Sequence, residues 1–357
     1  MQNFVPRIFR AHVSYTQGME KLRMLFVRTA YDEAELLGRR VREYVEREMQ
    51  EFECEYCADF EEAEKRLKGE VFNVVLPLSC PLARAEDVKR IAKSMSLKGL
   101  RVAKFHSSRA YIVRGKSQDA GIFVGSPAFF EISDAKSFSL VYNTLRDRIA
   151  DGHLSRGVTI LDPHSTFIDD TVEIGENAQI LPFCRIQGRT KIESGAVVSA
   201  SILVDTVVRA GACVECSHVV GSTIGENASV GPFARLRSAN IGNGCRIGDF
   251  VEIKASTIGD GTKSAHLTYI GDATVGERTN VGCGTVFCNY DGRTKHKTHV
   301  GNDCFVGANV NLVAPVKVGD NCFVAAGTTV TKDLADNTFA IGRTMQKTKF
   351  NTPKQQD

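Results

Sequence analysis

The stretch Val300–Val330 reads VGNDCFVGANVNLVAPVKVGDNCFVAAGTTV. It places an aliphatic residue at every sixth position, at Val300, Val306, Leu312, Val318, Val324 and Val330. Glycine directly follows three of these residues, at 301, 307 and 319. A period of six fits neither an amphipathic helix nor a simple alternating strand. The stretch therefore predicts a repeated structural unit of six residues.

The same period runs through most of the second half of the chain. Its aliphatic positions are Ile168, Ile174, Ile180, Ile186, Ile192, Val198, Ile202, Val208, Val214, Val220, Ile241, Ile247 and Ile253. Such a repeat is typical of the hexapeptide parallel β-helix. Each hexad makes a short strand and a turn, its aliphatic residue points into a narrow core, and three hexads close a coil of roughly 18 residues. Where the period shortens, as from 198 to 202 and from 220 to 224, we interpret the slip as a shortened corner.

Length and composition limit the possible classes of protein. A chain of 357 residues favours two domains. The net charge of +3, from 45 basic and 42 acidic residues, argues against a general nucleic-acid binder. The sequence contains no apolar run of about 18 residues, so no membrane span is expected. Its N-terminus lacks a long apolar segment, and we expect a cytoplasmic protein.

Strand and helix signals alternate before the repeats begin. Buried-strand patterns occur at 24–27, 72–78, 100–104, 110–113 and 121–124, and helical patterns at 32–50, 85–94 and 137–150. This alternation predicts a small, mostly parallel sheet covered by helices. The expected organisation is a disordered lead-in at 1–20, a smaller α/β domain at 21–150, an all-β solenoid at 157–343 and a tail at 344–357.

The chain has eleven cysteines, including two pairs with CxxC spacing, Cys54/Cys57 and Cys213/Cys216. A zinc site usually needs a second such pair or a matching histidine pair nearby. We therefore expect reduced thiols that behave as small hydrophobic residues, with Cys213 and Cys216 inside the solenoid pattern. A metal or redox role for either pair is the alternative.

Polar and cationic residues gather where the solenoid pattern is interrupted. They are Arg235, Arg237, Glu252, Lys254, Lys263, His266, Tyr269, Asn280, Asn289, Tyr290 and Lys295. Several cations without an acidic counterweight suit a phosphate monoester. His266 is central in this set, and a catalytic base and a structural histidine are both open. One long interruption, Phe287–His299, predicts a functional loop, because the corners of a solenoid are otherwise tight.

These residues also carry a family resemblance. The motifs FARLR, FVEIK, HLTY, CNYDG and KHKT lie in the run from Val230 to Gly301. The chain from about Thr159 to Arg343 resembles the acetyltransferase half of bacterial bifunctional N-acetylglucosamine-1-phosphate uridyltransferase/glucosamine-1-phosphate N-acetyltransferase. The resemblance implies a left-handed β-helix, acetyl-CoA as co-substrate, N-acetylation of glucosamine 1-phosphate in the synthesis of a cell-wall precursor, and no metal for acetyl transfer. It also implies a homotrimer with active sites between subunits.

The resemblance assigns roles to individual residues. It implies that His266 is the catalytic base. It implies sugar-phosphate binding by the set Arg237, Lys254, Tyr269, Asn280, Lys295 and Glu252. It implies acetyl-CoA contacts at the set Cys283, Asn289, Tyr290, Ala308, Ala326 and Arg343. Two of these depart from the usual pattern, since Cys283 stands where the family has alanine and Ala308 where it has serine.

The first part of the chain matches less well. In the resembled enzyme this part is a nucleotidyltransferase with a Gly-rich phosphate loop after its first strand and an aspartate for a metal. Here MLFVRTA runs into YDEAELLGRR, and Ser79 and Cys80 stand where the aspartate is expected. We interpret residues 21–150 as a shrunken, degenerate nucleotidyltransferase-like domain without uridyltransferase activity. Retained nucleotide binding is the alternative.

Three other functions remain as alternatives for the solenoid. It could acetylate another amino sugar or a nucleotide sugar. It could be a non-catalytic regulatory subunit, against which the set of His266, Lys254 and Arg237 counts. It could be a zinc carbonic anhydrase of the same fold, but the nearby histidines His266, His296 and His299 have the wrong spacing for that.

Overall fold

The computed structural model describes residues 21–116 and 121–348. The expected lead-in at 1–20 and most of the expected tail at 344–357 lie outside this range. The chain divides into two compact units, Met1–Leu145 and Arg146–Asp357. The helix α4 (Ala135–Leu154) crosses from one to the other. Each unit is described by itself below.

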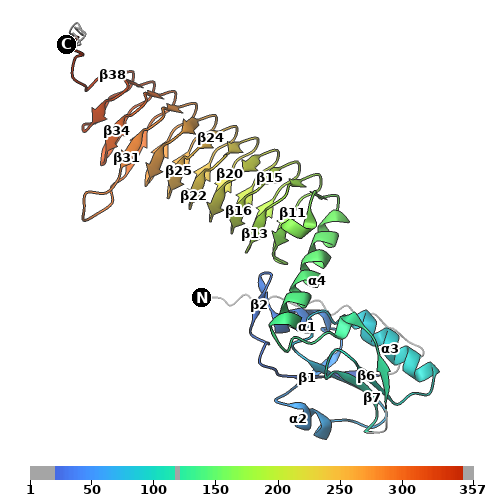
Figure 1. Cartoon of the computed structure of the whole chain (residues 1–357). Helices are drawn as coiled ribbons and strands as arrows, with labels where there is room; N and C mark the ends of the chain where they lie inside the picture. The colour runs from blue at the N-terminus through green and yellow to red at the C-terminus, as the bar shows by residue number, and fades with distance from the viewer. Residues whose placement is uncertain (1–20, 117–120, 349–357) are drawn as a thin grey trace, which may run out of the picture. The chain divides into compact units, whose positions relative to one another are not determined.

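The first unit is built on one mixed sheet of six strands. In spatial order these are β4 (Glu53–Cys57), β1 (Leu22–Val27), β5 (Phe72–Pro77), β7 (Tyr111–Arg114), β6 (Val102–Phe105) and β8 (Ile122–Val124). Strand β7 runs antiparallel to both of its neighbours, and the other pairs are parallel. The mostly parallel sheet predicted from the alternation of strands and helices is therefore present (Figure 1).

Helices lie on both faces of this sheet. The elements are α1 (Val41–Glu48), α2 (Phe60–Lys65), α3 (Ala85–Leu97) and the 3-10 turn η1 (Pro127–Phe129). On one face, α1 and α3 bury Val45, Val88 and Ile91 in a core that also contains Phe26. On the other face, α2 buries Ala63 in a smaller cluster. The face that carries α2 is thus the less covered one.

The helix expected from Asp32 onward begins later than the sequence pattern indicated. Helix α1 starts at Val41, and a two-stranded hairpin precedes it, made of β2 (Glu35–Leu36) and β3 (Arg39–Arg40). Leu37 and Gly38 form its turn with φ of 46° and 80°. Two consecutive residues at positive φ close a tight hairpin and stop a right-handed helix, which outweighs the favourable charge pairing along the segment.

The second unit is a parallel β-helix with three faces. The first face has ten strands. They are β10 (Phe167–Ile168), β13 (Arg185–Gln187), β16 (Ile202–Val204), β19 (His218–Val220), β22 (Arg235–Arg237), β25 (Glu252–Lys254), β28 (Tyr269–Gly271), β31 (Val286–Cys288), β34 (Asn311–Val313) and β37 (Thr329–Val330).

The second face has nine strands and the third has eleven. The second consists of β11 (Glu173–Ile174), β14 (Lys191–Ile192), β17 (Val207–Val208), β20 (Thr223–Ile224), β23 (Asn240–Ile241), β26 (Thr257–Ile258), β29 (Ala273–Val275), β32 (Thr298–Val300) and β35 (Val316–Val318). The third consists of β9 (Thr159–Ile160), β12 (Gln179–Ile180), β15 (Val197–Ser199), β18 (Cys213–Glu215), β21 (Ser229–Val230), β24 (Arg246–Asp249), β27 (Lys263–His266), β30 (Asn280–Val281), β33 (Phe305–Val306), β36 (Phe323–Val324) and β38 (Phe339–Ala340). A short 3-10 turn, η2 (Pro163–Ser165), lies near the start.

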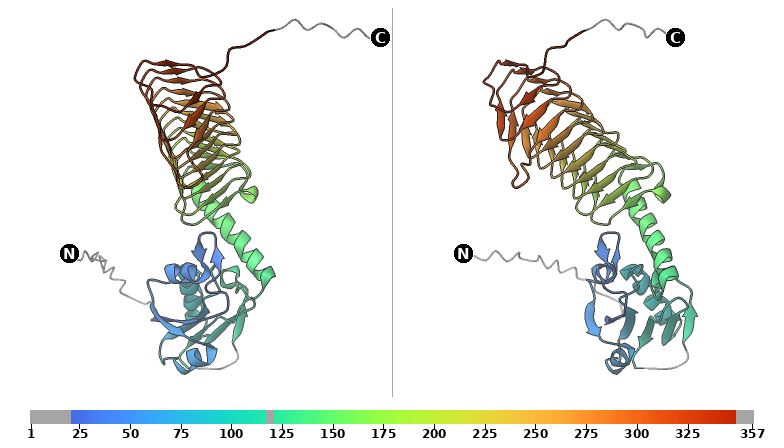
Figure 2. Two further views of the ribbon diagram at one scale, coloured as in Figure 1. Left: turned by 90° about the vertical axis from the view of Figure 1, so that its left-hand side faces the viewer. Right: turned by 60° about the vertical axis from the view of Figure 1, so that its left-hand side comes forward.

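Each strand pairs with the strand one coil away, and Figure 2 shows the coils stacked in this way. The aliphatic residues of successive coils therefore stack in columns. On the third face Val198 pairs with Val214, and Val214 with Val230. All three are fully buried in a single continuous core. Burial of each such side chain contributes about 1.5–3 kcal/mol, and the sum over the coils is what closes the solenoid.

Two expected core positions are displaced by one residue. Ile202 is 38% exposed, while its neighbour Leu203 is fully buried and pairs with Ile186. In the same way Val219 is fully buried and takes the place expected for Val220. Both positions adjoin a slip in the six-residue period, since Ile202 follows one and Val220 precedes one. Two adjacent aliphatic residues compete there, and the strand register, which the sequence pattern does not show, decides between them.

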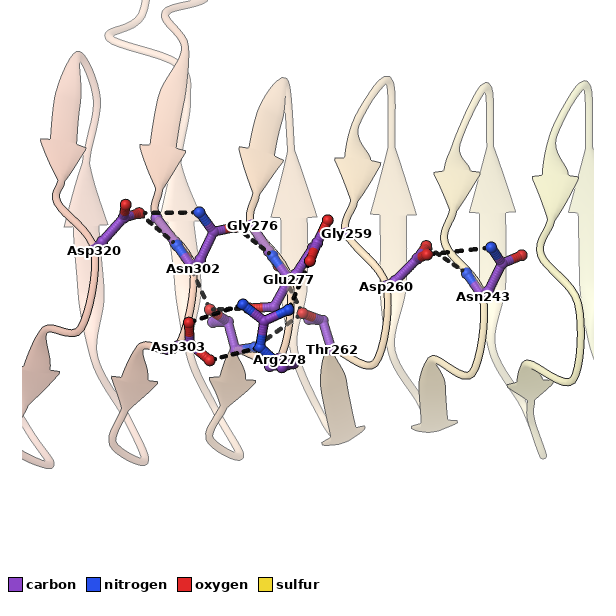
Figure 3. A network of polar contacts seen from close by, with 12 residues as sticks. Asn243, Gly259, Asp260, Thr262, Gly276, Glu277, Arg278, Asn302, Asp303 and Asp320 are labelled. Carbon is purple, nitrogen blue, oxygen red and sulfur yellow. Dashed lines mark hydrogen bonds and ion pairs between the residues drawn. The ribbon is translucent and has the colours of Figure 1, made fainter.

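The corner between the second and third faces is held by hydrogen bonds from one coil to the next (Figure 3). Oδ1 of Asp320 accepts from the backbone N–H of Asn302 at 2.8 Å, and Oδ1 of Asp260 accepts from that of Asn243 at 2.7 Å. Beside them Arg278 reaches Asp303, with Nε at 2.7 Å from Oδ1 and Nη2 at 2.9 Å from Oδ2. These contacts occupy backbone donors that the turns leave open.

The corner between the first and second faces ejects one long loop, visible next to β31 in Figure 1. The interruption was expected to begin at Phe287, but Phe287 is fully buried in β31 and pairs with Leu312. The ejected segment is 289–297, between β31 and β32. We call it the 289–297 loop. Phe287 was assigned to the loop because an aromatic residue replaces the usual aliphatic at a core position.

The two cysteine pairs lie in different surroundings. Cys54 and Cys57 lie on one strand, β4, and their side chains belong to the clusters on opposite faces of the sheet. Burial raises the pKa of the Cys57 thiol. Cys213 is exposed on the third face, so its expected burial is wrong, and Cys216 sits at a corner with φ of 44°. Within 21–116 and 121–348, no group of three or more His, Cys, Asp or Glu side chains could hold a metal ion.

Candidate active site

The corner between the third and first faces carries one column of predicted site residues. Core residues Ser264 and Val281 are paired on the third face, and His266 and Cys283 each stand two residues later. Backbone hydrogen bonds extend the column through Ala308 and Ala326: Asn309 N donates to Cys283 O and Gly327 N to Ala308 O, both at 2.8 Å. The expected base and three expected acetyl-CoA contacts thus lie on one line along the solenoid.

His266 has an acidic neighbour on the preceding coil. Asp249 is its register partner on the third face. Oδ2 of Asp249 lies 3.5 Å from Nδ1 of His266, and both side chains are about half exposed, at 43% and 56%. A carboxylate at Nδ1 favours a proton on that nitrogen and leaves Nε2 free to accept one. This is the tautomer that a general base on the Nε2 side requires.

At the far end of the first face, predicted phosphate ligands stack in a second column. Arg237 pairs in register with Lys254 on the next coil. Glu252 lies between them in the sequence, and its Oε1 forms an ion pair with Nη2 of Arg237. The expectation that these cations have no acidic counterweight is therefore wrong: Glu252 partly neutralises the Arg237 guanidinium until an anion competes for it.

The 289–297 loop brings a further cation to this column. The side chain of Lys295 is within hydrogen-bonding reach of Lys254, and this contact, together with repulsion between the two ammonium groups, lowers the pKa of Lys254. Asp272, on the adjoining corner, attracts both lysines. Two lysines held this close form a site with a strong preference for a doubly charged anion.

Asn289 connects the start of the loop to the first face. Its Nδ2 donates to Oδ2 of Asp272 at 2.5 Å and lies 3.4 Å from the hydroxyl of Tyr269. Asn289 is only 7% exposed, whereas Tyr290, the next residue, is 60% exposed. Asn289 therefore anchors the loop, and Tyr290 presents its ring to solvent.

Asp291 gives the loop its shape. Its Oδ1 accepts from the backbone N–H groups of Arg293 and Thr294, both at 2.7 Å, and its Oδ2 lies 2.7 Å from Nε2 of His296. These contacts hold the pKa of Asp291 well below its usual range. Tyr290 and Lys295 form an antiparallel bridge across the turn. Lys295 is thus carried on an ordered hairpin.

The column that contains Cys283, Ala308 and Ala326 continues to Arg343. Nη1 of Arg343 donates to the carbonyl oxygen of Ala326 at 3.2 Å, and Arg343 is exposed. Cys283 and Ala326 are also exposed, and the three small side chains of the column leave their backbone accessible. A narrow ligand could lie along this corner against backbone atoms, with a guanidinium at its end.

One predicted ligand lies on another face. Asn280 begins β30 on the third face, in the same outward row as Lys263 and Phe305. The cations Arg237 and Lys254 lie at the opposite end of the first face. The outer surfaces of two faces of a triangular prism point in different directions, so one chain does not bring Asn280 and these cations around one small ligand.

The carbonic anhydrase alternative is excluded by the positions of its histidines. His266 is on the third–first corner, His296 is in the 289–297 loop, and His299 faces outward on β32 in the second face. These three side chains occupy three different parts of the prism, so a single chain does not bring them to one zinc ion.

Two acidic residues of the site were missed by the sequence argument. Asp249 and Asp272 lie one coil from His266 and from Asn289, respectively. The sequence does contain a signal for these contacts, because each aspartate precedes its partner by one coil of the repeat. The coil length varies, however, and the stacking partner of a corner residue then depends on the register.

Comparisons with known proteins agree with this architecture. Residues 297–332 match the family "Bacterial transferase hexapeptide (six repeats)". Together with the three parallel faces, this match makes the second unit a left-handed parallel β-helix of the hexapeptide-repeat class.

The chain is homologous to proteins named "Bifunctional protein GlmU". It is 45% identical over 241 residues to the protein of Caldanaerobacter subterraneus subsp. tengcongensis. The aligned residues make up 67% of this chain and 53% of that protein. It is 51% identical over 204 residues to that of Clostridium botulinum (strain ATCC 19397 / Type A), covering 57% and 45%. The chain spans about half the length of the curated relatives it matches.

Similar solved structures are more distant. The Arabidopsis UDP-N-acetylglucosamine acyltransferase is 17% identical with a TM-score of 0.32, over 51% of this chain and 69% of that one. LpxA of Bacteroides fragilis is 20% identical with a TM-score of 0.27, over 50% and 70%. Similarity at this level carries no argument about function.

Proposed function

We propose that the protein transfers the acetyl group of acetyl-CoA to the amine of glucosamine 1-phosphate, giving N-acetylglucosamine 1-phosphate for UDP-N-acetylglucosamine synthesis. The observation that carries the proposal is the arrangement of the solenoid: a histidine with a carboxylate at Nδ1, a column of small residues beside it, and a group of cations at the other end of the same face. The homology to GlmU proteins, 45% identity over 241 residues in one case, also supports the proposal.

His266 is the general base in this reaction. The amine of an amino sugar is largely protonated at neutral pH and must lose a proton as its nitrogen attacks the thioester carbonyl. Nε2 of His266 accepts that proton, and Asp249 at Nδ1 stabilises the imidazolium that forms. The tetrahedral intermediate then breaks its C–S bond and expels the CoA thiolate, which takes the proton from the imidazolium and leaves as free thiol. General-base catalysis of this kind contributes about 10²–10⁴-fold. The attack of an amine on a thioester needs no metal ion.

Arg237, Lys254 and Lys295 bind the phosphate and so fix the position of the amine. Glu252 releases Arg237 when the phosphate arrives, and the Tyr269 hydroxyl serves the sugar hydroxyls. Asn289, which lies 3.4 Å from that hydroxyl, is placed beside the acetyl group of acetyl-CoA. Acetyl-CoA lies along the column of Cys283, Ala308 and Ala326, with Arg343 toward its phosphates. The oxyanion is stabilised by backbone N–H groups near Cys283 or Tyr290.

In this proposal the active form is a homotrimer, and its active sites lie between subunits. Asn280 lies on the third face, whereas Arg237 and Lys254 lie on the first. A second copy of the chain must therefore supply either Asn280 or the cations. A ridge of exposed apolar residues supports an interface on the third–first corner: Phe233 and Phe250 are 56% and 59% exposed, and their rings stack at 5.3 Å. Both have φ near 58°, a strained conformation for a bulky residue.

A cytoplasmic location fits eleven unpaired cysteines.

The test is thiol release from acetyl-CoA with purified protein and three acceptors: glucosamine 1-phosphate, glucosamine 6-phosphate and a UDP-linked amino sugar. We expect turnover with the first and a loss of at least about 100-fold in His266→Ala, with the oligomer unchanged in sedimentation. His218→Ala, an exposed histidine on the first face, is the matched control. Preference for another acceptor would make the protein a different sugar acetyltransferase. No turnover with any acceptor would leave a non-catalytic subunit.

We also propose that the first unit is a degenerate nucleotidyltransferase-like domain without uridyltransferase activity. After β1 the chain enters the β2–β3 hairpin instead of a Gly-rich loop. Ser79 and Cys80 follow β5 and are fully buried, and burial raises the pKa of the Cys80 thiol well above its usual value. Pyrophosphate release from UTP and N-acetylglucosamine 1-phosphate tests this. Turnover above background would contradict it.

A further inference from the structure

The less covered face of the sheet in the first unit holds a cavity of about 550 Å³. Its floor is one row of side chains across three strands: Tyr111 of β7 pairs with Lys104 of β6, and Lys104 pairs with Phe123 of β8. Val102 and Val113, also paired, extend the floor. The volume is within the range of small-molecule sites, about 300–1,000 Å³.

Helix α2 and the chain leading into β7 form the walls of this cavity. Phe60, at the start of α2, lies under the guanidinium of Arg109, which is 4.7 Å from the centre of the ring. Leu67 is buried and also lines the cavity, and Phe123 is 60% exposed with one face of its ring stacked on His106 at 4.9 Å. Two aromatic rings thus line an open cavity, a surface on which a flat ring can pack.

The Tyr111 hydroxyl is the polar group inside the cavity. Its oxygen is buried and has no hydrogen-bond partner among residues 21–116 and 121–348. Burial raises the pKa of Tyr111 to about 12, so the hydroxyl keeps its proton. A buried hydroxyl without a partner costs about 1–3 kcal/mol, and a ligand that displaces the side chains around the oxygen and accepts its hydrogen bond recovers this cost.

Charge at the cavity favours an anion. Lys104 is exposed directly beside Tyr111 and makes no ion pair with the described residues. Arg109 is held by Glu131, with Nε at 3.0 Å from Oε1, and presents the rest of its guanidinium at the rim. Glu64 is the single acidic residue that lines the cavity. The Glu64 carboxylate also makes no ion pair with the described residues and, after burial, helps to raise the pKa of Tyr111, so an anionic group is favoured only beside the Lys104 ammonium.

We propose that this cavity binds an amphipathic aromatic anion. The flat ring packs between Phe60 and Phe123, an acceptor on the ligand takes the hydrogen bond of the Tyr111 hydroxyl, and a carboxylate or phosphate group meets Lys104. The site lies wholly within the first unit and does not depend on the acetyltransferase proposal.

Calorimetric titration of the full chain with 1-naphthoate tests the site. Two analogues separate its requirements: cyclohexanecarboxylate keeps the charge without the aromatic ring, and 1-naphthalenemethanol keeps the ring without the charge. We expect 1-naphthoate to bind at least about 5-fold more tightly than either. Equal or absent binding of the three compounds would overturn the proposal.

Variants of the floor residues locate the binding. Tyr111→Phe removes the hydroxyl and should weaken naphthoate binding about 5- to 10-fold, while the melting temperature of the free protein stays the same or rises. Lys104→Gln should weaken it about 3- to 5-fold, and Lys98→Gln, an exposed lysine after α3, should leave it unchanged. If both floor variants bind like the wild type, 1-naphthoate is not in this cavity and the assignment is wrong.

Discussion

Asp249 and His266 lie one above the other on successive coils, with Oδ2 of the carboxylate 3.5 Å from Nδ1 of the imidazole. The two side chains come from equivalent ends of β24 and β27, so the repeat itself sets their spacing. A coil-to-coil neighbour can orient a catalytic ring because both side chains project from the same corner of the prism. In the proposed mechanism Asp249 is therefore a positioning residue.

Asp249→Asn should lower kcat about 10-fold, part of the 10²–10⁴-fold that a general base supplies. The amide retains the shape of the side chain but not the charge that stabilises the imidazolium. The KM for glucosamine 1-phosphate should stay within about 2-fold, since the phosphate ligands are untouched. Glu252→Gln, next to the Arg237 guanidinium, is the comparison and should change KM more than kcat. A normal kcat in Asp249→Asn would remove Asp249 from the mechanism.

Lys295→Gln should raise the pKa of Lys254 in the free protein. A hydrogen bond donated by the Lys295 ammonium to the neutral Lys254 amine, and repulsion between the two groups when both are charged, lower that pKa from 10.5, so Lys254 loses its charge at a lower pH than an ordinary lysine. Without Lys295 the midpoint moves upward, which NMR titration of the lysine ε-methylene signals between about pH 8 and 12 measures. Lys297→Gln, on the same loop, should leave the midpoint in place. A midpoint unchanged in Lys295→Gln would show that the two lysines do not interact.

The same variant should raise the KM for glucosamine 1-phosphate about 10-fold at pH 7.5, because one of three cations around the phosphate is lost. The kcat should change less than the KM, since His266 and Asp249 remain.

The six-residue period was sufficient to predict the solenoid, because only a chain that buries one side chain per hexad has it. The period failed locally where two aliphatic residues are adjacent, as at Ile202 and Leu203. Strand register decides such positions, and register depends on corner lengths in the neighbouring coils. The helix expected from Asp32 failed for a local reason, since the Leu37–Gly38 turn is a two-residue signal inside a strongly helical charge pattern.

The candidate site was predicted in part. Arg237, Lys254 and Lys295 do come together, and the motifs that contain them identified them by resemblance. Their acidic partners were not predicted, because Asp249 and Asp272 approach the site from other coils. Which residues share a corner depends on coils of unequal length, and that information is in the structure rather than in the motif.

Acidification should destabilise the protein through His153. His153 is 3% exposed, and burial, followed by the nearby Arg156 guanidinium, lowers its pKa from 6.5 to about 4. The unfolded chain therefore binds a proton below about pH 6.5 that the folded protein does not take up until about pH 4. The free energy of unfolding falls across this window, by roughly 2–3 kcal/mol, and is unaffected by this group above it.

Chemical denaturation at pH 7, 5.5 and 4.5 measures this loss. His153→Leu removes the titrating group, so its stability should fall less steeply with acid than that of the wild type. His218→Leu, which changes an exposed histidine, should keep the wild-type slope. If wild type and His153→Leu lose stability in parallel, the acid sensitivity arises elsewhere.

Gly301→Ala should destabilise the solenoid by about 2–4 kcal/mol. A Cβ at this position would lie 2.3 Å from Oδ1 of Asp320 and 2.7 Å from its backbone nitrogen, atoms of the next coil that cannot both move away. The substitution adds a steric cost of about 1–3 kcal/mol and breaks the hydrogen bond from the Asn302 N–H to Oδ1 of Asp320, about 1 kcal/mol more. Gly152→Ala is the matched control, because that glycine lies inside α4 with only the Arg156 side chain within 4 Å. Alanine there should stabilise by up to about 1 kcal/mol, since it favours the helix. Guanidinium denaturation followed by circular dichroism compares the two variants. A Gly301→Ala protein as stable as the wild type would show that the close approach of the coils at this corner does not exclude a side chain at position 301.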